Sequence, residues 1–145
     1  MRRFIFLVYF SFFVAKTASA FVVPPLTGPV VDLMGVLSQK NIQLLTEGLS
    51  QLYRHQGTQI QVVILKQLDD LPIEEVSIKI VDEWKLGHKD SDRGVLLLIA
   101  MKEHKARIEV GRGLEGDLPD VIAKRIIDHT LLPLFRQKDY SGGIL

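Results

Sequence analysis

The sequence contains no cysteine. This excludes disulfide bridges, zinc sites built on thiolates and catalysis by a thiol nucleophile. The H-E-x-x-H pattern of zinc proteases is also missing, and the four histidines stand at no other metal-ligand spacing. No G-x-S-x-G pattern occurs, so the chain lacks the serine nucleophile of the α/β hydrolases. These absences remove several common enzyme classes.

Long apolar runs are scarce, and the run at residues 4–15 has the context of an export signal. Two arginines precede it, and residues 18–20 read Ala-Ser-Ala, which is typical of a cleaved secretory leader. The run is shorter than the roughly 20 residues that a membrane span needs. We therefore expect residues 1–20 to be a signal peptide and residues 21–145 to form one periplasmic or secreted domain. An uncleaved membrane anchor is the alternative.

A net positive charge is missing from the expected domain. The leader holds three of the 18 basic residues and no acidic residue, so 15 basic side chains remain against 17 acidic ones. Binding to nucleic acid depends on a positively charged surface that neutralises phosphates. The composition therefore predicts no nucleic-acid partner.

Helical patterns occur in three parts of the domain. Apolar residues recur at helical spacing between Ser38, a good N-cap, and Gly57, a good C-terminal stop. A second apolar stripe follows Pro72 and is expected to end at Gly87. A third helix begins after Pro119, with a kink or restart further along at a second proline.

Strand patterns alternate with these helices. The continuous apolar runs at 60–65 and 95–100 predict strands that are covered on both faces. Residues 106–110 alternate between apolar and charged, as an edge strand does. This order predicts an α/β fold, a three-layer α/β/α sandwich with a small mixed sheet and helices on both faces. Residues 21–29 hold three prolines and are expected to form an extended arm.

The last two strands predict an acidic site. They form an antiparallel hairpin, so the loop before the first strand and the loop after the second should meet at one end of the sheet. Carboxylates held close together need a cation, and oxygen ligands of this kind suit a hard divalent metal ion. The alternative is that they are solvated turn residues, some paired with nearby arginines. The acidic residues of these loops are Asp90, Asp92, Glu115 and Asp117, with Asp120 just beyond.

Two other motifs in these loops are rejected. Residues 111–116 read G-x-G-x-x-G, but Glu115 and Asp117 would repel a pyrophosphate, so no nucleotide cofactor is predicted. We expect the three glycines to form a tight turn with positive φ angles. Residues 90–94 resemble the head of a calcium loop, but an EF-hand needs a glutamate where Met101 stands. His88 is either a plain loop residue or an acid–base group beside the acidic loops.

Several ordered motifs together resemble the TPM domain family. The resemblance runs from Leu26 to the end of the chain, and the glycine–glutamate loop is its most specific part. The segments that carry it are 30–38, Trp84 with Gly87, 92–97, 107–116, 118–120, and Pro133 with 139–143.

The resemblance implies an extracytoplasmic domain that binds a divalent cation, calcium or magnesium, at an acidic loop site. The acidic positions that match the family's motif are Asp32, Asp92, Glu115 and Asp120. Family members include a thylakoid-lumen acid phosphatase linked to photosystem repair and a companion of a neurotransmitter receptor. The chain is therefore expected to be a binding or assembly module for a membrane-associated protein, and a metal-assisted acid phosphatase is the alternative.

Two arginines depart from the family pattern. Arg93 and Arg112 replace an asparagine and a tyrosine that are frequent in relatives. Either guanidinium could pair with a carboxylate and weaken metal binding, or could hold a phosphate group. The helix expected after Asp139 is cut short at Leu145, which suggests a fragment or a shortened member of the family.

Overall fold

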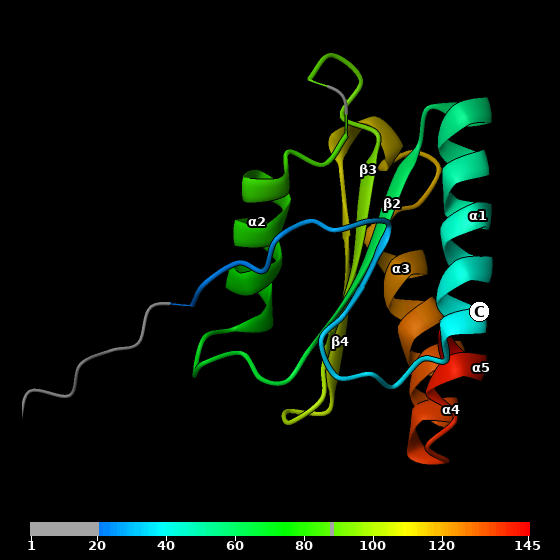
Figure 1. Cartoon of the computed structure of the whole chain (residues 1–145). Coiled ribbons are helices and arrows are strands. Elements are labelled where there is room, and N and C mark those ends of the chain that lie inside the picture. The colour runs from blue at the N-terminus through cyan, green and yellow to red at the C-terminus, as the bar shows by residue number, and fades with distance from the viewer. Residues whose placement is uncertain (1–20, 88) are drawn as a thin grey trace, which may run out of the picture.

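The computed structural model describes residues 21–87 and 89–145 of the chain. The expected leader, residues 1–20, and His88 lie outside the described residues. A single four-stranded sheet has the order β1-β2-β3-β4 (Figure 1). The first three strands run parallel, and the fourth runs antiparallel to the third. The strands are β1 (Val30–Asp32), β2 (Gln59–Leu65), β3 (Gly94–Ala100) and β4 (Lys105–Val110).

Helices cover both faces of this sheet, which confirms the three-layer α/β/α prediction (Figure 1). One layer is α2, and the other is α1 with the C-terminal helices. Within residues 21–87 and 89–145, none of the helices combines the length and the hydropathy needed to cross a bilayer. The α-helices are α1 (Gln39–Gln56), α2 (Ile73–Trp84), α3 (Asp120–Ile126), α4 (Leu132–Arg136) and α5 (Tyr140–Ile144), with a 3₁₀ turn at Arg112–Leu114 and a π-helical turn at Ile127–Leu131.

Most helix ends follow the local signals. The Ser38 hydroxyl accepts a hydrogen bond from the Asn41 N–H at 3.2 Å and caps α1. Gly57 closes α1 in the left-handed conformation, as expected. The end of α2 differs, because Lys85 rather than Gly87 is the left-handed residue at the C-cap.

The face under α2 forms the deeper part of the core. Val76, Ser77 and Ile80 of α2 are fully buried against β3 and its neighbours. The same face fixes the N-terminal arm, because the indole N–H of Trp84 donates to the carbonyl O of Pro24 at 2.8 Å. The extended segment 21–29 is therefore attached to the domain by a buried hydrogen bond.

The face under α1 is less well covered. No residue of α1 is buried. The apolar side chains on its inner face pack against the sheet but remain partly exposed. The same cluster receives Phe135 of α4 and Ile144 of α5. This layer is assembled from several short contacts rather than one closed helix face.

The strand β1 was not predicted from the sequence. Its three residues, Val30–Asp32, are too few to show a strand period, yet they pair with Val62, Val63 and Ile64 of β2. The sheet has two helical crossovers, β1-α1-β2 and β2-α2-β3. Each leads to the next strand on the same side of the preceding one, so both move across the sheet in the same direction. Since α1 and α2 lie on opposite faces, the crossovers have opposite hands, and one departs from the usual right-handed connection.

Candidate functional site

Two loops meet at the end of the sheet where β3 begins and β4 ends. The Gly111 N–H donates to the Gly94 carbonyl at 2.7 Å, and the Gly113 N–H donates to the Asp92 carbonyl at 3.1 Å. The Asp92 carboxylate accepts the Arg112 N–H at 3.1 Å. The predicted convergence of the loops is thus confirmed. We call the two segments, 89–93 and 111–117, the acidic rim.

The glycines of the rim serve a different purpose from the one predicted. None of Gly111, Gly113 and Gly116 has a positive φ, so the expected left-handed turn is wrong. A methyl group on Gly111 would overlap the carbonyl oxygen of Asp92, and one on Gly113 would overlap that of Ser91. Two of the three glycines are therefore needed because the loops approach so closely.

Arg93 links the two loops to the sheet. Its guanidinium donates to the Gly113 carbonyl at 3.3 Å and to the Thr58 hydroxyl at 3.2 Å. It also lies 3.6 Å from the Asp117 carboxylate. Arg93 therefore pairs with a carboxylate, one of the two roles that the sequence allowed. Its positive charge sits among the acids that were expected to share a metal ion.

Two of the four acidic positions carried over from the family lie at this rim, namely Asp92 and Glu115. Asp32 lies elsewhere. It pairs with Ile64 of β2, which pairs with Ile99 of β3, so Asp32 stands at the same height in the sheet as Ile99. At about 3.3 Å per residue this level is roughly 16 Å along the strand from Gly94. Asp32 and Asp92 therefore cannot share one ion.

The carboxylate of Asp32 has a structural role instead. It accepts the Met34 N–H at 2.9 Å and the Leu37 N–H at 2.8 Å, which holds the turn between β1 and α1. Asp120, at the start of α3, lines a hollow beside β4 together with Glu74 and Arg107. Across residues 21–87 and 89–145, no three His, Asp or Glu side chains are gathered closely enough to hold a metal ion. The rim as it lies offers only part of a ligand set.

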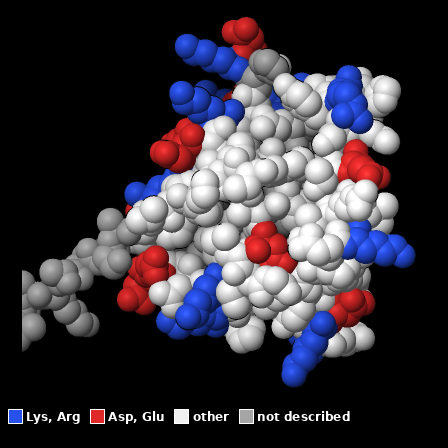
Figure 2. Space-filling model, in the orientation of Figure 1, with Lys and Arg blue, Asp and Glu red and all other residues white. Residues whose placement is uncertain are grey.

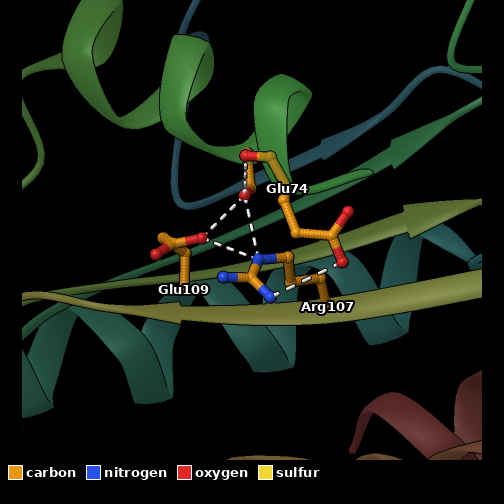
Figure 3. Close-up of polar contacts among 4 residues, drawn as sticks. Glu74, Arg107 and Glu109 are labelled. Carbon is orange, nitrogen blue, oxygen red and sulfur yellow. Dashed lines mark hydrogen bonds and ion pairs between the residues drawn. The ribbon is translucent and has the colours of Figure 1, made fainter. Parts of the chain in front are cut away.

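A second polar cluster joins α2 to β4 (Figure 3). Arg107 Nε donates to the Glu109 carboxylate at 2.7 Å and to the Ser77 hydroxyl at 3.1 Å. Ser77 Oγ lies 2.7 Å from the Glu109 carboxylate and 2.9 Å from the Glu74 carbonyl. Because Ser77 is fully buried, its hydroxyl is inaccessible to substrate. The cluster fastens the edge strand to the helix layer.

The charges on the visible surface are mixed in sign (Figure 2). Basic and acidic side chains are interspersed around a largely uncharged face, with no broad area of one sign among the described residues in this view. This mixture agrees with the near balance of acidic and basic residues in the sequence.

Sequence reasoning missed the contribution of Thr58 and Gln59 to the rim. The Gln59 side chain accepts the Gly87 N–H at 2.9 Å, and the Gln59 N–H donates to the Arg93 carbonyl at 2.8 Å. The parallel pairing of β2 with β3 brings these residues beside Gly94. The apolar runs at 60–65 and 95–100 could have been aligned as neighbouring parallel strands, and this alignment would have placed Gln59 beside Gly94.

A family model and several solved structures match this chain. The model described as TPM domain matches residues 30–145. The N-terminal domain of a protein from P. gingivalis, solved by NMR, has 31% sequence identity and a TM-score of 0.75. The alignment covers 81% of this chain and 75% of that one.

Two further NMR structures are similar in fold alone. The N-terminal domain of cg2496 protein from Corynebacterium glutamicum has 16% identity and a TM-score of 0.62, with coverage of 85% of this chain and 78% of that one. BA42 protein from the psychrophilic Bizionia argentinensis has 15% identity and a TM-score of 0.58, covering 74% and 73%. No curated protein matches the chain.

Proposed function

The chain belongs to the TPM domain family, and from this premise we propose that it is an exported binding module for a membrane-associated protein. In this proposal the acidic rim takes up a divalent cation, calcium or magnesium, as part of the docking surface. The observation that carries the proposal is the locked geometry of the rim. Hydrogen bonds between the loops fix the backbone from which its carboxylates project, and they hold the carboxylate of Asp92 directly.

The rim suits docking because its order is already established before a partner arrives. Asp92 has a left-handed backbone, with φ of 46°, and both its carbonyl and its carboxylate are bonded to the second loop. The carboxylates of Asp90 and Glu115 are exposed and form no hydrogen bond or ion pair with the described residues. A preorganised surface loses little conformational entropy when it binds.

The cation would be held by an incomplete set of protein ligands. Calcium accepts six to eight oxygen ligands in flexible geometry, and magnesium keeps several waters. The Glu115 and Asp90 side chains can supply some of these oxygens, and water or carboxylates of the partner would supply the others. A cation held in this way joins the module to its partner, which suits assembly better than permanent storage of the ion.

Backbone NMR can test the cation step with one matched pair of variants. We expect the amide signals of Gly94, Gly113 and Gly116 to shift as calcium chloride is added up to about 10 mM. This concentration exceeds the 10⁻⁴–10⁻³ M dissociation constants of extracellular calcium modules. Glu115→Gln should weaken this response roughly tenfold because it removes a charged oxygen ligand. Glu83→Gln, which changes an exposed carboxylate on α2, is the control.

Two results would contradict the cation step. Absence of any amide shift at the rim over the whole titration, with calcium and with magnesium, would exclude binding there. An equal response in Glu115→Gln and Glu83→Gln would show that the rim carboxylate contributes nothing.

The export step has an independent test. Cleavage of a leader at residues 1–20 predicts a mature protein that begins at Phe21. Mass spectrometry of the protein recovered from the expressing cells measures this directly. A product that retains Met1, held in the membrane fraction, would instead support an uncleaved anchor.

A second candidate function is an acid phosphatase. The exposed guanidinium of Arg112 favours it, because it forms no hydrogen bond or ion pair with the described residues, while the backbone N–H of Arg112 donates to the Asp92 carboxylate. Such a group can hold a phosphate oxygen pair. A divalent cation, when bound, would polarise a phosphoryl oxygen and lower the pKa of a water molecule. Equal hydrolysis of an aryl phosphate by the native protein and by Arg112→Gln would remove this role.

A further inference from the structure

A pocket of about 490 Å³ opens at the opposite end of the sheet from the acidic rim. It lies where β3 turns into β4 and is closed on its other side by α4 and α5. Its wall includes an aromatic pair, Phe135 and Tyr140, whose rings meet edge to face at 5.1 Å. The apolar residues that line it are Ile99, Ala100, Met101, Leu132, Phe135 and Tyr140.

Basic side chains surround this apolar floor. His104 comes from the hairpin turn and Lys105 from the start of β4, while Arg136 and Lys138 come from the end of α4 and the turn after it. Among the residues that the structure describes, no carboxylate lines the pocket. None of the four basic side chains forms an ion pair or a hydrogen bond with a residue in the described part of the chain. We call this site the basic pocket.

The two acidic residues nearest in sequence are directed elsewhere. Glu103 precedes His104, but its carboxylate accepts the Leu68 N–H at 3.2 Å. Asp139 follows Lys138, but its carboxylate caps α5 by accepting the Gly142 N–H at 2.8 Å. Each carboxylate accepts from a backbone amide, and neither forms an ion pair with a basic side chain of the pocket.

Two of the basic side chains stand on backbone that favours glycine. His104 has φ of 51° and Lys138 has φ of 63°. A side chain in this left-handed region costs on the order of 1 kcal/mol relative to the ordinary helical region. Strain of this kind is often found where a side chain is needed at a binding site. Both residues place their side chains at the pocket.

We propose that the basic pocket binds a small organic anion with an apolar body that contains a ring. The apolar body would displace water from Met101, Leu132 and the aromatic pair, as in most small-molecule pockets of this size. The anionic head would lie among the unpaired cations, where charge-assisted hydrogen bonds are strong. The pocket needs no divalent cation and shares no residue with the acidic rim.

The test compares an anion with its neutral analogue. 4-Phenylbutanoate and 4-phenylbutanol have the same body and differ in the charge of the head. Each is titrated into the protein without divalent cation while the Met101 methyl and the Tyr140 ring are followed by NMR. We expect the carboxylate to bind about tenfold more tightly than the alcohol, and its affinity to fall as salt is added.

Matched double variants locate the site. Arg136→Gln with Lys138→Gln should weaken the carboxylate about tenfold, as expected when two charge-assisted contacts are lost. Lys124→Gln with Arg125→Gln makes the same change in net charge on α3, away from the pocket, and should leave the affinity unchanged.

Three outcomes would overturn the proposal. The first is equal affinity for the alcohol and the carboxylate, and the second is equal weakening by the two double variants. The third is a response at the amides of Gly94 and Gly113, at the far end of the sheet, in place of a response at Met101 and Tyr140. A failure here leaves the cation titration of the rim unaffected, since that experiment follows other residues.

Discussion

The two ends of β3 differ in whether charged side chains are paired and in how closely the surrounding loops pack. At its beginning, the guanidinium of Arg93 has three partners and the two loops touch through glycine backbones. At its end, the side chains of Arg136 and Lys138 form no hydrogen bond or ion pair with the described part of the chain, and an apolar hollow lies beside them. One end is closed by contacts within the chain. The other is open and has an excess of one charge.

This difference separates two kinds of polar site. Charges that satisfy one another build a rigid surface, which favours recognition of a large partner without rearrangement. Charges left without partners beside an apolar hollow favour a ligand that brings the opposite charge with it. Substitutions at the closed end should therefore affect stability more than equivalent ones at the open end.

The largest expected effect is at the closest contact of the closed end. Gly113→Ala forces the two loops apart, because the new methyl group overlaps the Ser91 carbonyl. We expect the free energy of unfolding to fall by about 3 kcal/mol, as in other overpacked sites. Urea denaturation measures it. Gly116→Ala is the control, since nothing lies within 4 Å of the added group, and equal losses in the two variants would refute the close-contact explanation.

The second-largest effect is expected when the guanidinium of Arg93, which links the two loops, is removed. Arg93→Gln loses hydrogen bonds to Gly113 and Thr58 and the ion pair with Asp117. The free energy of unfolding should fall by about 1–2 kcal/mol. Arg136→Gln, at the open end, should change it by less than about 0.5 kcal/mol. If urea denaturation gives the same value for both arginines, the contrast between the ends is lost.

A glycine at the open end should give a smaller change of opposite sign. Lys138→Gly relieves a left-handed backbone with φ of 63° and should raise the free energy of unfolding by up to about 1 kcal/mol. It should also weaken binding of 4-phenylbutanoate. Lys138→Ala weakens binding without the gain in stability, because alanine retains the strain, and a stabilised alanine variant would contradict this account.

The smallest effect is expected at the exposed ion pair. Asp117→Asn removes a contact 3.6 Å long in which the aspartate side chain is 74% exposed. Surface pairs of this kind contribute about 0.3 kcal/mol and are screened by salt. The stability difference from the native protein should vanish when urea denaturation is repeated in high salt. A difference that persists would mean that Asp117 has another role.

Local patterns in the sequence were enough for most of the fold. Ser38 and Gly57 act on the residues next to them, and the apolar runs that form β2 and β3 can only be buried. The hairpin of β3 and β4 brought the two rim loops together as expected. Features that depend on neighbouring residues could therefore be predicted.

The parts that could not be predicted depend on distant contacts. The three residues of β1 are too short for a period, and without that strand the sequence does not show that Asp32 lies at the other end of the sheet. Gly111 and Gly113 look like turn residues because a close approach to another loop leaves no trace in the local sequence. The basic pocket combines a hairpin turn with two helices, and no single motif describes it.

The buried bond between Trp84 and Pro24 gives the protein a built-in optical reporter. Trp84 is the only tryptophan of the chain, and its ring is shielded at the place where the extended arm rests on α2. Detachment of the arm from α2 would expose the indole to water and shift its fluorescence emission to longer wavelength. Attachment and release of the segment that follows the expected leader can thus be watched in solution without a label.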